Sequence, residues 1–135
     1  MKPDLLRIPA AVRAAAAEGN ALVKAGFKGG TALGLARGRQ LADGGRISMH
    51  DAMIMRAWFA RHYFSSRPTY MQWLRAAPDR RRRKGAWKGA VAWLIWGGDA
   101  AYKWILSDAV QDAIVRWGSK QGKRLKPRVP LETNI

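Results

Sequence analysis

The sequence predicts an all-α fold: a compact bundle of about five short helices followed by a basic, extended C-terminal tail. Hydrophobic residues make up 48% of the 135 residues, which is enough for the core of one domain. No segment alternates apolar and polar residues as a half-buried strand does, and glycine and proline divide the chain into short helical stretches. We therefore predict a single helical domain over residues 1–118 and a basic tail over residues 119–135.

Apolar spacing and capping residues predict the individual helices. The helical segments cover residues 9–25, 31–42, 48–64, 69–76, 87–96 and 100–117. Thr31, Ser48 and Asp99 are the expected N-caps, because their side-chain oxygens accept a bond from the first helical turn. Residues 65–68, which include a proline, are expected to be a connector. A hairpin around Gly44–Gly45 is disfavoured, because its flanks are rich in Ala and Arg.

The charge balance is strongly one-sided. Lys and Arg total 25 against 9 Asp and Glu, which gives a formal net charge of +16. Such an excess opposes compaction by self-repulsion, and solubility alone requires a net charge of only about 2–8. We therefore expect a polyanionic partner, nucleic acid first, with DNA favoured over RNA. The chain has no Cys, so disulfides and thiolate metal sites are excluded.

A run of five consecutive cations is the clearest candidate binding segment. Their mutual repulsion favours an external counter-charge, and a guanidinium donates two parallel hydrogen bonds to a phosphate. A tryptophan within the same segment, if exposed, would stack on a base of a single strand. The expected contact residues are Arg80, Arg81, Arg82, Arg83, Lys84, Trp87 and Lys88. Trp73 is the next stacking candidate, and the alternative for the whole run is a solvated charged loop.

Two further groups of cations are candidates. One surrounds the second predicted helix and the turn after it, and it consists of Arg37, Arg39 and Arg46. The other lies in the tail, where a disordered basic arm would follow a phosphate backbone and order on binding, unless it is an inert terminus. The tail cations are Lys120, Lys123, Arg124, Lys126 and Arg128. Residues 31–64 resemble a helix-turn-helix only weakly and show no base-reading set, so phosphate contacts are expected to outweigh base readout.

No catalytic constellation is predicted. His50 and His62 are the only histidines and lie twelve residues apart on one predicted helix, too far to share a metal. Asp108 and Asp112 are the only close acidic pair and are expected to balance Lys103 and Arg116 nearby. No phosphate-binding P-loop is present. We predict a non-enzymatic protein with no catalytic residues, no metal and no cofactor.

The chain also lacks segments typical of membrane insertion or export. The N-terminus has no continuous apolar region of the kind found in signal peptides. No run of about 18 apolar residues is present, so no transmembrane segment is expected.

Two stretches carry a family resemblance. One reads Gly-Thr-Ala-Leu-Gly-Leu-Ala-Arg-Gly-Arg-Gln-Leu over residues 30–41, with Ser48 and Phe59–His62 beyond it. The other reads Ala-Trp-Leu-Ile-Trp-Gly-Gly-Asp-Ala over residues 92–100, followed by Trp104. Together they resemble a small domain of tailed bacteriophages and prophages that is sometimes fused to head-assembly or protease proteins.

The resemblance covers roughly residues 29–64 and 87–104. The family typically has a Gly- and Pro-rich linker between the two motifs, whereas this chain has residues 69–74 and then the cation run. The resemblance implies a phage origin, a role near DNA or the virion, and a location in the host cytoplasm or the virion. It supplies no catalytic residues. On physical grounds alone, Gly97–Gly98 and Asp99 are interpreted as a structural corner.

Three functions stay open on the sequence alone. The leading hypothesis is a phage-encoded nucleic-acid-binding protein, largely sequence-independent, that contacts phosphates through Arg and Lys clusters. The second is a non-enzymatic virion or host-interaction protein that docks on an acidic protein surface. An anionic membrane surface ranks last, because the apolar residues are needed for a core. The sequence does not separate DNA from RNA or single from double strands, and it does not predict an oligomeric state.

Overall fold

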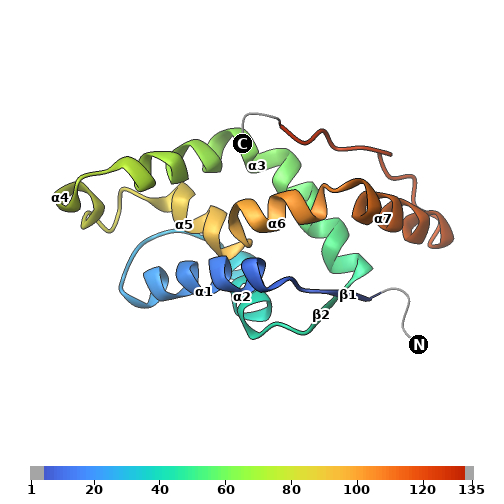
Figure 1. Ribbon diagram of the computed structural model, residues 1–135, viewed down its shortest axis with the longest axis horizontal. Coiled ribbons are helices and arrows are strands. Elements are labelled where there is room, and N and C mark those ends of the chain that lie inside the picture. The colour runs from blue at the N-terminus through green and yellow to red at the C-terminus, as the bar shows by residue number, and fades with distance from the viewer. Residues whose placement is uncertain (1–4, 133–135) are drawn as a thin grey trace.

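The structure, a computed structural model, describes residues 5–132 and is elongated (Figure 1). The described part contains seven helices and one small sheet, so the predicted helical character is confirmed, while the number of helices and the sheet differ from the prediction. The helices are α1 (Ala10–Lys24), α2 (Ala32–Asp43), α3 (Met49–Arg75), α4 (Pro78–Arg81), α5 (Lys88–Ile95), α6 (Gly98–Ile105) and α7 (Asp108–Lys120). The strands are β1 (Leu5–Arg7) and β2 (Arg46–Ser48).

Helix α5 lies at the centre of the bundle (Figure 1) and contacts α1, α2, α3 and α6. All of its apolar residues except the half-buried Ala92 are buried, as expected for a helix that is apolar nearly all round. Glycine allows α1 to approach it closely: a Cβ on Gly19 would lie 2.7 Å from the backbone nitrogen of Ile95. The core is therefore built around one short helix that other helices enclose.

Helix α3 is a single helix of 27 residues, so the predicted connector at residues 65–68 is wrong. Pro68 lies inside it, where a proline removes one helical hydrogen bond and costs about 3 kcal/mol. The helix continues because Trp73, beyond the proline, is buried in a separate apolar cluster with Trp87 and Ala90. Tertiary packing thus outweighs the local preference.

Two of the three predicted N-caps are confirmed and one is wrong. The side chains of Thr31 and Ser48 accept bonds from the first turns of α2 and α3, so both predicted caps are confirmed. The predicted cap Asp99 is wrong, because α6 begins after Gly97, whose φ is +102°, and Asp99 lies in the first turn. The predicted helix 100–117 is divided into α6 and α7, because Ser107 caps α7.

The small sheet was not predicted. Strand β1 pairs antiparallel with β2, so Leu6 lies opposite Ile47 and both contribute to the core. Gly44 and Gly45, with φ of +80° and +83°, turn the chain from α2 into β2. The sequence could not predict this sheet for two reasons. Strands of three residues are too short to show an alternation of apolar and polar residues, and the two strands lie about forty residues apart along the chain.

Candidate nucleic-acid interface

The cation run Arg80–Lys84 lies at one extremity of the molecule, where α4 projects at the left of Figure 1. Arg81 is half-buried and the other four cations are exposed. Lys88 begins α5 and is also exposed. The structure therefore brings these six predicted cations together at one end of the fold.

Two arginines of the run are supported by aromatic rings. The guanidinium carbon of Arg81 lies 4.6 Å from the centre of the Trp73 ring, and its Nε donates to the Trp73 carbonyl at 2.8 Å. The guanidinium carbon of Arg80 lies 5.2 Å from the centre of the Trp87 ring, whose Nε1 donates to the Arg80 carbonyl at 3.1 Å. These contacts fix the direction of α4 relative to α3 and α5.

The other three cations of the run are only partly compensated. Arg82 forms an ion pair with Asp79. Lys84 Nζ donates to the carbonyl of Ala25 at 2.6 Å, which orients the ammonium without neutralising it. Within the described chain, Arg83 forms no ion pair. The run therefore keeps most of its positive charge in the folded state.

A second segment adds cations that the sequence analysis did not group with the run. The backbone nitrogen of Lys28 donates to the Lys84 carbonyl at 2.8 Å, so the loop after α1 lies against the turn after α4. This loop carries the exposed Lys28, and the exposed Lys24 lies in the last turn of α1. We call the set Lys24, Lys28, Arg80–Lys84 and Lys88 the α4 end. The segment of Lys24 and Lys28 and the segment of residues 80–88 are far apart in the sequence, so no local pattern could predict that they meet.

The predicted stacking role of Trp87 requires correction. Its ring is only 1% exposed and that of Trp73 is 7% exposed, so neither face is available to a base. The two rings meet edge to face with centres 5.4 Å apart. Both tryptophans support the α4 end from inside, so the exposed surface of this end offers cations and no free indole.

The predicted nucleic-acid contact of Arg37 is also wrong, because the side chain is buried. It is 5% exposed, its Nη1 lies 3.2 Å from the Asp51 carboxylate, and it lies over the Trp96 ring. Burial alone would raise the pKa of Asp51, but hydrogen bonds from Gln40 and Arg37 outweigh it and hold the pKa below its ordinary value of 3.8. Arg37 therefore joins α2 to α3 and cannot reach a ligand, whereas Arg39 and Arg46 of the same predicted group are exposed.

The C-terminal segment, residues 121–132, is not the free arm that the sequence analysis expected over residues 119–135. Residues 119 and 120 still belong to α7, and the segment after them, which has no helix or strand in its described part, runs back along α7 toward α3 (Figure 1). Arg56 Nη2 donates to the Lys126 carbonyl at 2.6 Å, and the nitrogen of Glu132 donates to Tyr102 Oη at 2.9 Å. Arg128 pairs with Asp112 at 2.7 Å and with Asp108 at 3.6 Å. The expected partners Lys103 and Arg116 are therefore wrong, because both acids pair with a cation of the C-terminal segment.

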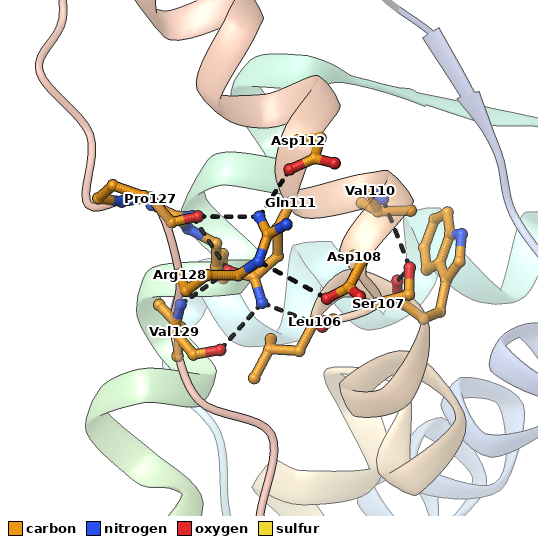
Figure 2. A network of polar contacts seen from close by, with 11 residues as sticks. Leu106, Ser107, Asp108, Val110, Gln111, Asp112, Pro127, Arg128 and Val129 are labelled. Carbon is orange, nitrogen blue, oxygen red and sulfur yellow. Dashed lines mark hydrogen bonds and ion pairs between the residues drawn. The ribbon is translucent and has the colours of Figure 1, made fainter.

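Gln111 of α7 holds this segment in place (Figure 2). Its Nε2 donates to the carbonyls of Leu106 and Val129 at 3.0 and 2.9 Å. Its Oε1 accepts from the nitrogen of Val129 at 2.8 Å and from Arg56 Nη1 at 3.1 Å. The side-chain amide thus binds both backbone groups of Val129, much as a neighbouring strand would.

Arg56 is a buried cation that forms no ion pair with a carboxylate among residues 5–132. It is 5% exposed, and its partners are the Gln111 side chain and the Lys126 carbonyl. Burial and the nearby Arg128 both lower its pKa. The buried guanidinium of Arg56 is therefore hydrogen-bonded to two neutral oxygens, which replace the water lost on burial, and one of them belongs to the C-terminal segment.

The remaining predicted tail cations are separated from the α4 end. Lys120, Lys123, Arg124 and Lys126 are exposed, and the first three lie around the end of α7, at the right of Figure 1. The molecule therefore has positive charge at both ends of its long axis.

Asp99 of the Trp-Gly-Gly-Asp-Ala motif has a structural role. Its carboxylate accepts from Trp93 Nε1 at 2.8 Å and from two nitrogens of Arg67, each at 3.1 Å. A Cβ on Gly97 would lie 2.4 Å from the Cβ of Ala101, so the corner requires glycine. The motif joins α5, α6 and α3, which agrees with its interpretation as a corner.

The histidines lie against tryptophans and not against one another. The rings of His62 and Trp58 have centres 4.9 Å apart, and burial together with Arg61 lowers the pKa of His62. The ring of His50 lies beside Trp117. Across residues 5–132 no three His, Asp or Glu side chains gather where they could hold a metal ion.

None of the helices in the described range is both long enough and apolar enough to cross a membrane. Comparison with protein-family models, with curated proteins and with solved structures finds no match for this chain.

Proposed function

We propose that this protein binds DNA through its phosphates, largely without regard to base sequence, and that the α4 end is the principal contact surface. The observation that carries the proposal is the charge of that end. Eight cations from two chain segments gather there, and Arg82 alone has a carboxylate partner among the described residues. A folded chain gains nothing from this concentration of like charge unless an external anion compensates it.

The chemistry of the surface favours phosphate over base edges. Exposed Arg and Lys side chains supply only donors, and the two indoles at the α4 end, Trp73 and Trp87, are buried. Phosphate contacts orient a protein on nucleic acid but carry no direct sequence information. The phage origin implied by the sequence resemblance stays a prediction and agrees with a role beside DNA.

The test is a salt series with a 20-base-pair duplex. If the α4 end makes about 6–8 phosphate contacts, the wild-type affinity falls by roughly 10³–10⁴ between 50 and 200 mM salt. The double variant Arg83→Gln/Lys88→Gln removes two exposed cations that form no ion pair within the described chain. It should lower affinity by about 10²-fold at 0.1 M salt and reduce the salt slope by about 1.8.

The matched control is Arg61→Gln/Lys103→Gln. It removes one Arg and one Lys from exposed positions on α3 and α6, away from α4. Equal losses in both variants, or wild-type binding that ignores salt, contradict the proposal. A stoichiometric complex with an acidic protein that survives nuclease treatment would instead support the protein-docking alternative.

A further inference from the structure

The small sheet places two arginines directly opposite each other. In the register of β1 and β2, Arg7 lies across from Arg46, while Leu6 lies across from Ile47. Leu6 and Ile47 point into the core, so the arginines share the opposite, outer face. Both are exposed.

The hydrogen-bond pattern brings these two side chains as close as a sheet allows. Ile8 N donates to the Gly45 carbonyl at 2.8 Å, which makes this the hydrogen-bonded pair of the ladder. The next pair, Arg7 and Arg46, is therefore a non-hydrogen-bonded pair, in which opposite Cα atoms are only about 4.5 Å apart and side chains are closest. Like charges at such a position oppose strand pairing.

A third arginine lies at the base of the same sheet. A Cβ on Gly44 would lie 2.4 Å from Nε of Arg13 and 2.8 Å from its Cζ, so the guanidinium rests against this glycine. Gly44 begins the turn that leads into β2. Arg7, Arg13 and Arg46 come from three elements, and none forms an ion pair with any residue in the range 5–132.

We propose that Arg7 and Arg46, together with Arg13 at the turn before β2, form a phosphate-binding site that is separate from the α4 end. A phosphate between the two strands would accept parallel bonds from both guanidiniums and cancel their repulsion. The inference rests on the proposed function, because a nucleic-acid backbone is the expected source of that phosphate. A free phosphate ion carries the same chemistry, so the test separates the two sources.

The test compares Arg46→Gln with Arg61→Gln, a matched change at an exposed helical position. Without duplex or pyrophosphate, Arg46→Gln should raise Tm by about 1–4 °C at 20 mM sodium chloride, because it removes a like-charge pair, and the gain should shrink at 500 mM. With the 20-base-pair duplex, it should lower affinity by about tenfold at 0.1 M salt and reduce the salt slope by about 0.9. Pyrophosphate should raise the Tm of the wild type more than that of Arg46→Gln.

The outcomes separate this site from the α4 end. If the wild type binds the duplex and Arg46→Gln behaves like Arg61→Gln with both ligands, the site is refuted and the proposed function stands. If the duplex does not bind but pyrophosphate stabilises only chains with Arg46, the site stands as a small-anion site and the proposed function fails. If neither the duplex nor pyrophosphate distinguishes Arg46→Gln from Arg61→Gln, the inference is overturned. The arginine pair would then serve only to prevent the exposed strand edge from pairing with another chain.

Discussion

Replacement of Gln111 by Ala should detach the C-terminal segment and destabilise the fold. Gln111 is 1% exposed and takes part in four hydrogen bonds. The backbone groups of Val129 can bind water once released, but the Leu106 carbonyl and the Arg56 guanidinium stay buried. A lost neutral bond costs about 1 kcal/mol and one to a charged group about 2 kcal/mol. With the cavity left by the side chain, we expect a total of about 3–5 kcal/mol.

For a chain of this size, that loss lowers Tm by about 10–20 °C, which differential scanning calorimetry measures. Trypsin gives a local readout, because the Arg128–Val129 bond lies at the Gln111 contact and should be cleaved faster in the variant. The matched control is Gln72→Ala, an exposed position of α3, with an expected change within about 0.5 kcal/mol. A Tm within about 2 °C of wild type, or unchanged cleavage at Arg128, would refute the role assigned to Gln111.

Three further predictions concern stability and the buried side chains. Asp51→Asn should cost about 2–3 kcal/mol at pH 7, because it leaves Arg37 buried without its carboxylate. The pKa of Asp51 in the folded protein lies below 3.8, so the stability contributed by its ionised carboxylate is present at neutral pH and is lost as the pH falls through that pKa. In urea unfolding, the free energies of the wild type and the variant should therefore converge below about pH 4. Gly97→Ala should lower the free energy of unfolding by more than the roughly 1 kcal/mol expected for Gly45→Ala. Both glycines have positive φ, but only a Cβ at Gly97 would meet a neighbour, the Cβ of Ala101 at 2.4 Å. Equal losses of unfolding free energy in chemical denaturation would contradict this. Trp87→Phe should cost about 1–3 kcal/mol and leave duplex affinity within about twofold, and a large loss of affinity in the folded variant would restore the stacking role.

Local signals in the sequence predicted the mostly helical character of the fold and the N-caps of two helices. Thr31 and Ser48 bond to backbone groups within three residues, so the information lies in one short window. The continuity of α3 through Pro68 could not be predicted in the same way. It depends on Trp73 meeting Trp87, and these two residues are separated by the whole of α4.

The same distinction applies to the candidate site. The cation run is visible in the sequence, because its members are adjacent, but Lys28 joins it only through a bond to the Lys84 backbone. Arg37 looked like a free surface cation because Asp51, its partner, lies fourteen residues further on in a different helix. Composition predicts how much charge the chain carries, while only tertiary contacts decide which cations remain available.

The buried guanidinium of Arg56 also constrains how the protein is made. Its two acceptors belong to Gln111 and Lys126, which lie 55 and 70 residues later in the chain. Synthesis proceeds from the N-terminus, so Arg56 is made before either acceptor. Until residue 126 has emerged, Arg56 is better solvated by water than by the nascent chain, and the junction of α3 with α7 cannot close. We expect the N-terminal helices to associate during translation and this junction to form only once residue 126 has emerged.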